Sequence, residues 1–240
     1  MNAATNVFFI DGQPVSFEPG QSILQAALEA GVFIPHLCHH PQFTPHGSCK
    51  LCTVTVNGRS GSACTLRALP GQEVENNTPE LNGKRRVLLQ MLFVEGNHFC
   101  PGCEKSGNCQ LQALAYELEM VTPHFNHFYP EREVDSSHPD LMLDRNRCIM
   151  CGLCVRASRE MDGKDVFTIV GRGRESRVAV NSASGMLGDS DLSANDAAAK
   201  ICPVGALLKK RIGYAVPIGK RLYDAEPISA QVDRLANREA

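Results

Sequence analysis

The chain has 240 residues, of which 43% are hydrophobic and 21% are charged, a composition typical of a folded globular protein. Its 24 Lys and Arg nearly balance its 26 Asp and Glu, and the net charge of −2 argues against a strongly basic nucleic-acid-binding protein. The strongest apolar run, at residues 87–94, is far shorter than the ~18–20 residues of a membrane span, and no signal-peptide pattern precedes it. We therefore expect a cytoplasmic protein with no membrane span and no nucleic-acid partner.

The N-terminal part predicts a small sheet with one helix. Ser22 is a candidate N-cap, and Gly31 is a candidate stop for the helix. Asn57-Gly58 predicts a tight hairpin turn. Together these signals favour a β-grasp-like module within about the first 80 residues. The expected strands cover residues 7–10, 15–17 and 53–56, and the expected helix covers residues 23–30.

The rest of the chain predicts helices first and a mixed region afterwards. A helix over residues 81–94 would place Val87, Leu88, Met91 and Leu92 on one apolar face. The other expected elements are a helix at 110–120, strands at 166–170 and 177–180, a surface loop at 181–195, and short helical pieces at 197–201 and 204–208.

The eleven cysteines are the most informative feature of the composition. An odd number, concentrated in C-x2-C pairs and without an export signal, argues against disulfide bonds. Such thiols indicate metal ligation or redox chemistry.

The first constellation is Cys38-x10-Cys49-x2-Cys52-x11-Cys64. Four thiolates with a central C-x2-C suit a [2Fe–2S] cluster, which needs two thiolates for each iron. A four-thiolate zinc ribbon is the alternative, although ribbons usually have two C-x2-C knuckles. Small residues are expected to let the backbone approach the sulfurs and donate N–H bonds to them: Gly47, Ser48, Gly61 and Ala63.

The second constellation is Cys100-x2-Cys103-x5-Cys109, with His98 just upstream. Three cysteines leave a [4Fe–4S] cluster one ligand short, and imidazole is an acceptable iron ligand. We expect His98 to be that ligand. The alternative is a loop histidine beside a cluster whose fourth iron is bound otherwise or absent.

The third constellation is Cys148-x2-Cys151-x2-Cys154, followed 47 residues later by Cys202-Pro203. Three closely spaced cysteines and a remote Cys-Pro are typical of a [4Fe–4S] site. Two-cluster ferredoxins carry a further cysteine where this chain has Ser158, so we predict a single cluster here. Gly152 is expected to relieve crowding between the ligands.

The chain shows no convincing substrate site. Four histidines surround the first constellation and are expected to tune its potential, not to bind iron: His36, His39, His40 and His46. There is no G-x-G-x-x-G motif and no catalytic constellation of nucleophile, base and acid. Clusters without a substrate site indicate a protein that passes electrons between partners.

The three constellations, with the stretch from Gly96 to Gln112, resemble the N-terminal iron–sulfur region of the large peripheral-arm subunit of respiratory complex I. They are also similar to NAD-linked formate dehydrogenases, iron-only hydrogenases and the diaphorase iron–sulfur (gamma) subunits of soluble NAD-reducing [NiFe] hydrogenases. The 240-residue length favours the last group. In the larger family the histidine precedes the second site as His-x3-Cys, whereas here it is His98-x-Cys100. Either this loop is rebuilt around the same iron, or the fourth ligand differs.

The resemblance implies a hetero-oligomeric oxidoreductase that reduces NAD+ with H2. This chain would bridge a flavin/NAD-binding diaphorase subunit and the [NiFe] hydrogenase subunits. An iron–sulfur electron-transfer subunit of an NAD-linked formate dehydrogenase or of a complex I-like enzyme is one alternative. A zinc-stabilised interaction module is another.

The predicted fold class is α+β. We expect a ferredoxin-like β-grasp domain with one 2Fe-2S cluster at residues 1–80 and a helical segment with a 4Fe-4S cluster held by three Cys and one His at 81–135. A ferredoxin-like domain with a second 4Fe-4S cluster would follow at 136–212, and residues 213–240 would form a tail for docking onto another subunit or a packed surface segment.

Overall fold

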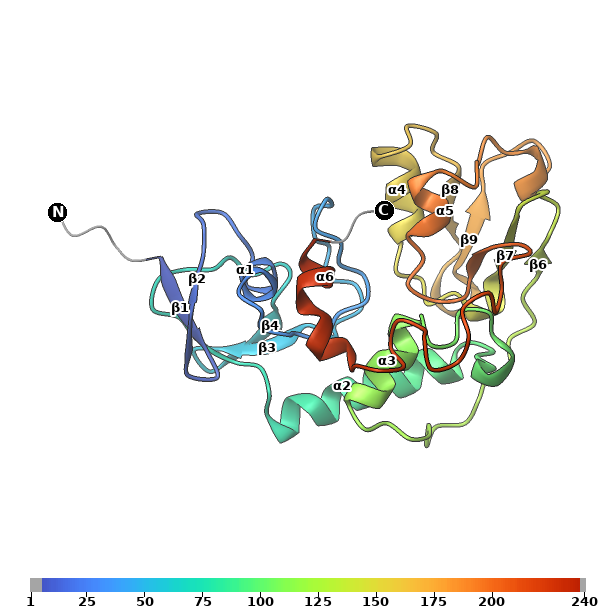
Figure 1. The fold of residues 1–240 in the computed structure, drawn as a ribbon. Helices are drawn as coiled ribbons and strands as arrows, with labels where there is room; N and C mark the ends of the chain where they lie inside the picture. Colours follow the sequence, from blue (N-terminus) through green and yellow to red (C-terminus); the bar gives the residue numbers. More distant parts are fainter. Residues whose placement is uncertain (1–5, 238–240) are drawn as a thin grey trace. The chain divides into compact units, whose positions relative to one another are not determined.

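The computed structural model describes residues 6–237, which form two compact units. Of these residues, 6–88, 117–119 and 227–237 belong to the first unit, and 89–116 and 120–226 belong to the second. Every helix within residues 6–237 is too short or too polar to span a membrane. The predicted α+β class is confirmed, because each unit combines helices with sheets (Figure 1).

The first unit is built on a five-stranded sheet with the order β2-β1-β5-β3-β4. β1 and β5 are parallel, and the other neighbours are antiparallel. Phe8 and Ile10 of β1 point into the core and are fully buried. The strands are β1 (Val7–Ile10), β2 (Gln13–Ser16), β3 (Thr53–Val56), β4 (Arg59–Ser62) and β5 (Glu73–Glu75).

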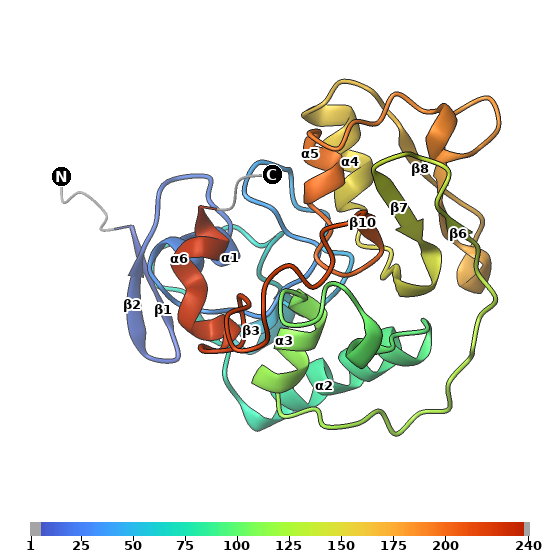
Figure 2. The ribbon, with the colours of Figure 1, turned by 45° about the vertical axis from the view of Figure 1, so that its right-hand side comes forward.

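The helix of this unit begins where the sequence predicts. Ser22 Oγ accepts a hydrogen bond from the Gln25 amide at 3.1 Å, which caps α1 (Ile23–Glu29). The C-terminal helix α6 (Val232–Ala236) contacts α1 through buried Val232 and Leu235 (Figures 1 and 2). Part of the expected tail, residues 232–236, is therefore packed into the core of this unit.

Helix α2 (Pro79–Val94) has a different buried face from the predicted one. Val87 and Met91 are exposed, whereas Leu81, Arg85 and Leu89 form the buried stripe at i, i+4 and i+8. The prediction is wrong for Val87 and Met91, because it counted only apolar residues and the buried stripe includes Arg85.

Within residues 89–116 and 120–226, the second unit holds two small sheets, three α-helices and the end of α2. One prediction fails here, since residues 204–208 are not helical. Instead, Leu207–Lys209 forms strand β10, antiparallel to β7 (Leu141–Asp144), because a distant strand supplies its hydrogen bonds. The sheets have the orders β10-β7-β6 and β8-β9, with β6 (Val134–Asp135), β8 (Phe167–Val170) and β9 (Arg177–Val180). The α-helices are α3 (Gln110–Glu117), α4 (Leu153–Glu160) and α5 (Ala197–Lys200) (Figures 1 and 2).

Candidate metal centres

The first centre lies where two loops meet the start of β3 and the end of β4. The thiols form two hydrogen-bonded pairs, Cys38 with Cys49 and Cys52 with Cys64. In each pair the hydrogen bond lowers the pKa of one thiol and raises that of the other, so Cys38 and Cys64 shift downward. The structure therefore brings all four predicted residues together.

Backbone amides of the first loop point at these sulfurs. The Cys49 amide lies 3.4 Å from Cys38 Sγ. The Ser48 amide also favours the Cys38 thiolate, and the Gly47 amide favours that of Cys64. Gly47 has a φ of +66°, which suits glycine and helps to turn the amides inward. Gly61 also packs closely against Leu66, because a Cβ there would lie 2.5 Å from a methyl group of that residue. Its expected approach to a sulfur stays a prediction.

Arg85 is a buried cation beneath this centre, 2% exposed. Its guanidinium donates to the carbonyls on either side of Cys52, those of Leu51 at 3.1 Å and Thr53 at 2.9 Å. Burial lowers the pKa of Arg85 to about 10, so it remains charged at neutral pH. It also donates to Asn76 O and Oδ1, both at 2.8 Å, and to Asn82 Oδ1 at 3.0 Å.

The histidines around this centre are largely internal. His36, His39 and His40 are at most 6% exposed, and the His36 ring nitrogen Nδ1 lies 2.8 Å from the Ile34 carbonyl. His46 helps to lower the pKa of the Cys38 thiol through its charge. Their expected role in tuning the potential stays a prediction.

The second centre surrounds a cavity in the second unit. It is lined by His98, Cys100, Cys103 and Cys109, together with Arg147 and Gly205. Cys100 lies in a short 3-10 turn, Cys100–Gly102, and Cys109 directly precedes α3. Burial raises the pKa of the Cys109 thiol to about 12, so a thiolate at this position requires a compensating cation such as iron.

The His98 imidazole fits the role of a ligand. Its Nε2 atom is buried and has no hydrogen-bond partner in the described part of the chain, and an unpaired buried nitrogen is unfavourable unless something binds it. Burial, and then the charge of Arg147, lower the pKa of His98 to about 4, which keeps the ring neutral. Gly96 packs against this ring, since a Cβ there would lie 2.7 Å from Nε2.

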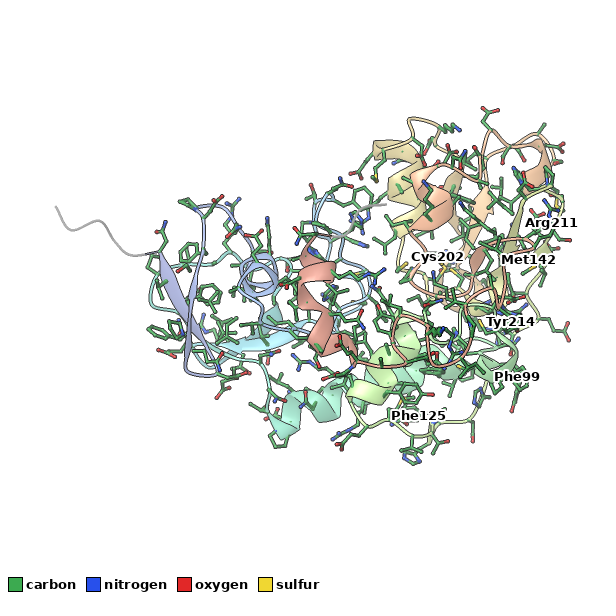
Figure 3. The ribbon with its side chains drawn as sticks, in the orientation of Figure 1. Phe99, Phe125, Met142, Cys202, Arg211 and Tyr214 are labelled. Atoms are coloured by element: carbon green, nitrogen blue, oxygen red, sulfur yellow. The ribbon has the colours of Figure 1, made fainter. Side chains whose placement is uncertain are left out.

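The third centre joins a loop before α4 to the residue after α5. Cys148, Cys151 and Cys202 all raise the pKa of the buried Cys154 thiol, after burial itself, so the four thiols share one location. Cys202 lies among the elements of the second unit, whereas Phe99 and Tyr214 are exposed (Figure 3).

Two residues near the third centre have structural roles. Gly152 has a φ of +71° at the N-cap of α4, so its conformation explains the glycine more directly than ligand crowding does. Ser158, at the position of a second-cluster cysteine, is fully buried, and its Oγ accepts from the Val166 amide at 2.6 Å.

The second and third centres lie directly against each other. Pro203, which follows Cys202, accepts a hydrogen bond from the Gln110 amide at 2.9 Å, and Gln110 follows Cys109. Gly205 lies so near the second centre that a Cβ there would be 2.6 Å from Cys103 Sγ. One backbone hydrogen bond and one glycine contact therefore connect the two cysteine sets.

This contact predicts that Gly205→Ala disturbs the second centre although Gly205 belongs to the loop of the third. The added methyl group must displace Cys103 Sγ, and we expect a changed EPR line shape or lower iron content at the second centre. Gly83→Ala is the control, because a Cβ there meets nothing within 4 Å inside a helix. Unchanged spectra in Gly205→Ala would contradict the close contact.

The donor arrangement differs from that of a single-ion site. Within residues 6–237 no three or more His, Cys, Asp or Glu side chains are arranged to hold one metal ion. None of the eleven cysteines, all of which lie within residues 6–237, forms a disulfide bond. A cluster needs a wider cage than zinc does, because its thiolates bind different irons.

The comparisons with known proteins agree with this division into centres. The family of 2Fe-2S iron-sulfur cluster binding domains matches residues 4–79, and that of 4Fe-4S single cluster domains matches residues 141–208. Between them, the NADH-ubiquinone oxidoreductase-G iron-sulfur binding region matches residues 85–124. The fold and these matches define an iron–sulfur protein that contains both 2Fe-2S and 4Fe-4S binding regions.

Whole-chain relatives narrow the class further. The chain is 43% identical to the NAD-reducing hydrogenase HoxS subunit gamma of Cupriavidus necator, covering 92% of this chain and 94% of that protein. It superposes with a TM-score of 0.92 and 56% identity on a chain in a crystal structure of an NAD+-reducing [NiFe]-hydrogenase in the H2-reduced state, covering 96% of this chain and 98% of that one. It is 31% identical to the mitochondrial NADH-ubiquinone oxidoreductase 78 kDa subunit of Neurospora crassa, covering 85% of this chain but 28% of that subunit.

The chain belongs to the family of NAD-reducing hydrogenase gamma subunits. It is an electron-transfer subunit of an oxidoreductase. The resemblance predicted from its cysteine motifs is thereby confirmed.

Proposed function

We propose that this chain carries electrons between a flavin- and NAD-binding subunit and the [NiFe] subunits of a cytoplasmic hydrogenase. The adjacency of the second and third centres within one unit carries this proposal. The Gln110–Pro203 hydrogen bond and the Gly205–Cys103 contact join the two cysteine sets of that unit. Support for the partners comes from the hydrogenase relatives.

Three clusters would use all eleven cysteines once. Clusters held at these positions would supply one-electron chemistry with little rearrangement. The chain's own residues bury these positions and direct backbone amides at the sulfurs. The proposed ligands are Cys38, Cys49, Cys52 and Cys64 for one [2Fe–2S] cluster; His98, Cys100, Cys103 and Cys109 for one [4Fe–4S] cluster; and Cys148, Cys151, Cys154 and Cys202 for another.

The proposed docking tail, residues 213–240, begins with exposed apolar side chains. Tyr214 is 64% exposed and Ile218 is 85% exposed. Large apolar side chains on loops are common at subunit interfaces. We place the first centre on a side branch of the electron path, since the two four-iron centres already form a continuous pair.

The partner assignment is tested by purifying the chain with its associated subunits under mild conditions. We expect nickel and flavin to co-purify in amounts comparable to this chain. Molybdenum without nickel would instead show a formate dehydrogenase, and quinone reduction would show a complex I-like enzyme. A colourless zinc protein would overturn the redox function itself.

The proposed histidine ligand gives a separate prediction. His98→Cys should retain the second cluster but lower its reduction potential, because a thiolate adds the negative charge that imidazole lacks. His98→Ala should lose the fourth iron or change the EPR signal. Redox titration followed by EPR measures both, with the exposed His124→Ala as control. An unchanged signal and potential in His98→Ala would contradict ligation.

A further inference from the structure

Arg147 lies between the second and third centres. It directly precedes Cys148 of the third centre, yet its side chain lines the cavity of the second. Its NH1 group donates toward Cys103 Sγ at 3.6 Å. The side chain is only 18% exposed, so water screens its charge weakly.

Two carboxylates fix the orientation of this guanidinium. Glu104 Oε2 lies 2.6 Å from NH1, and Asp144 Oδ2 lies 2.8 Å from Nε. Asp144 is itself held in place, because its Oδ1 accepts from the Asn146 amide at 3.0 Å. The loop of Cys202 closes the other side, where a Cβ on Gly205 would lie 3.5 Å from Arg147 Cδ. The N–H donor is therefore aimed at the sulfur by its surroundings.

A fixed cation with an N–H bond to a ligand sulfur favours the reduced, more negative form of a cluster. Hydrogen bonds to the sulfurs and net charge are among the main determinants of cluster potentials. Arginine suits this role, because it stays charged and offers several donors in one plane.

We propose that Arg147 is a positioning residue that raises the reduction potential of the second centre by holding a positive charge and an N–H donor at Cys103 Sγ. The proposal rests on the four-iron cluster assigned above to this centre. Since Cys148 is its neighbour in the chain, Arg147 also influences the third centre, but more weakly because no hydrogen bond from it to a third-centre thiol is found in the described residues. Arg147 thus helps to set the difference in potential along the proposed path.

The test is a redox titration of the full chain with its clusters, followed by low-temperature EPR. In Arg147→Gln we expect the equilibrium constant for one-electron reduction of the second centre to fall about tenfold, or ~59 mV. Arg147→Lys keeps the charge and should restore most of the potential. Arg174→Gln is the matched control, because this arginine is 93% exposed and paired with Glu175.

Glu104→Gln separates an electrostatic role from a structural one. Both substitutions break the same 2.6 Å ion pair. Loss of the carboxylate should raise the potential of the second centre, whereas loss of the guanidinium should lower it. Shifts in the same direction, or an unmoved potential in Arg147→Gln, would overturn the proposal.

Loss of the second cluster, in the variant or in the unaltered chain, is also interpretable. If Arg147→Gln does not retain the cluster, Glu104→Gln decides: an upward shift supports the proposal, and no shift overturns it. If the unaltered chain lacks a second four-iron signal, the cluster assignment fails first and the role of Arg147 fails with it.

Discussion

Replacing Cys202 by serine should abolish the transfer of electrons from H2 to NAD+ in the assembled enzyme. Cys202 is one of four thiols that share the third centre, and a single path through adjacent centres cannot bypass a missing cluster. Oxidation of NADH by artificial acceptors should continue, because in the proposed arrangement those electrons pass from NADH to the flavin subunit and leave it without entering this chain. Cys148→Ser should behave in the same way. The measurement compares both activities in each purified variant.

Assembly must be checked in the same preparations. Co-purification of all subunits shows that a lost activity reflects the path and not a dissociated complex. Cys64→Ser, at the first centre, is the comparison variant and should leave much of the coupled activity, since that centre is proposed to be a side branch. Loss of NADH oxidation in assembled Cys202→Ser, or survival of the coupled activity, would contradict the proposed path.

Arg85→Met should destabilise the first unit by about 3 kcal/mol or more. The substitution leaves the carbonyls of Leu51 and Thr53 without their buried donor, and each unpaired buried acceptor costs ~1–3 kcal/mol. Because these carbonyls flank Cys52, the first cluster should be lost together with stability. Urea unfolding, followed by the visible absorption of the cluster, measures both effects.

The neighbouring arginine provides the control for this prediction. Arg86 lies on the same helix and makes one hydrogen bond, to the Leu118 carbonyl at 3.3 Å. Arg86→Met should therefore lower stability by less than ~1 kcal/mol. Equal losses of stability in the two variants would show that the hydrogen bonds from Arg85 to the Leu51 and Thr53 carbonyls do not stabilise the segment around Cys52.

Local sequence signals predicted much of the fold. The strand at Val7–Ile10, the helix capped by Ser22 and the hairpin at Asn57-Gly58 each depend on residues close together in the chain. Strand β5 and strand β10 were missed because each has three residues, and distant partners supply its pairing. A short segment of this kind has no periodicity of its own.

The cysteines were recognised as cluster ligands because, except for Cys202, the members of each set lie close together in the sequence. The structure groups each predicted set, while the assignment of particular ligands to clusters stays a prediction. Two supporting residues were not predicted, Arg85 and Arg147. From sequence alone a charged residue is expected at the surface. The burial of Arg85 and Arg147 depends on carbonyls, carboxylates and a sulfur contributed by other segments of the chain. The i, i+4, i+8 spacing of Leu81, Arg85 and Leu89 was the available signal for the first of them.

The central claim is that this chain holds three iron–sulfur clusters. The most direct measurement combines iron and labile-sulfide analysis with low-temperature EPR of the reduced, full-length protein. We predict about ten irons for each chain, as one [2Fe–2S] and two [4Fe–4S] signals. A preparation with full protein folding but zinc in place of iron, or with EPR signals from fewer than three clusters, would contradict it.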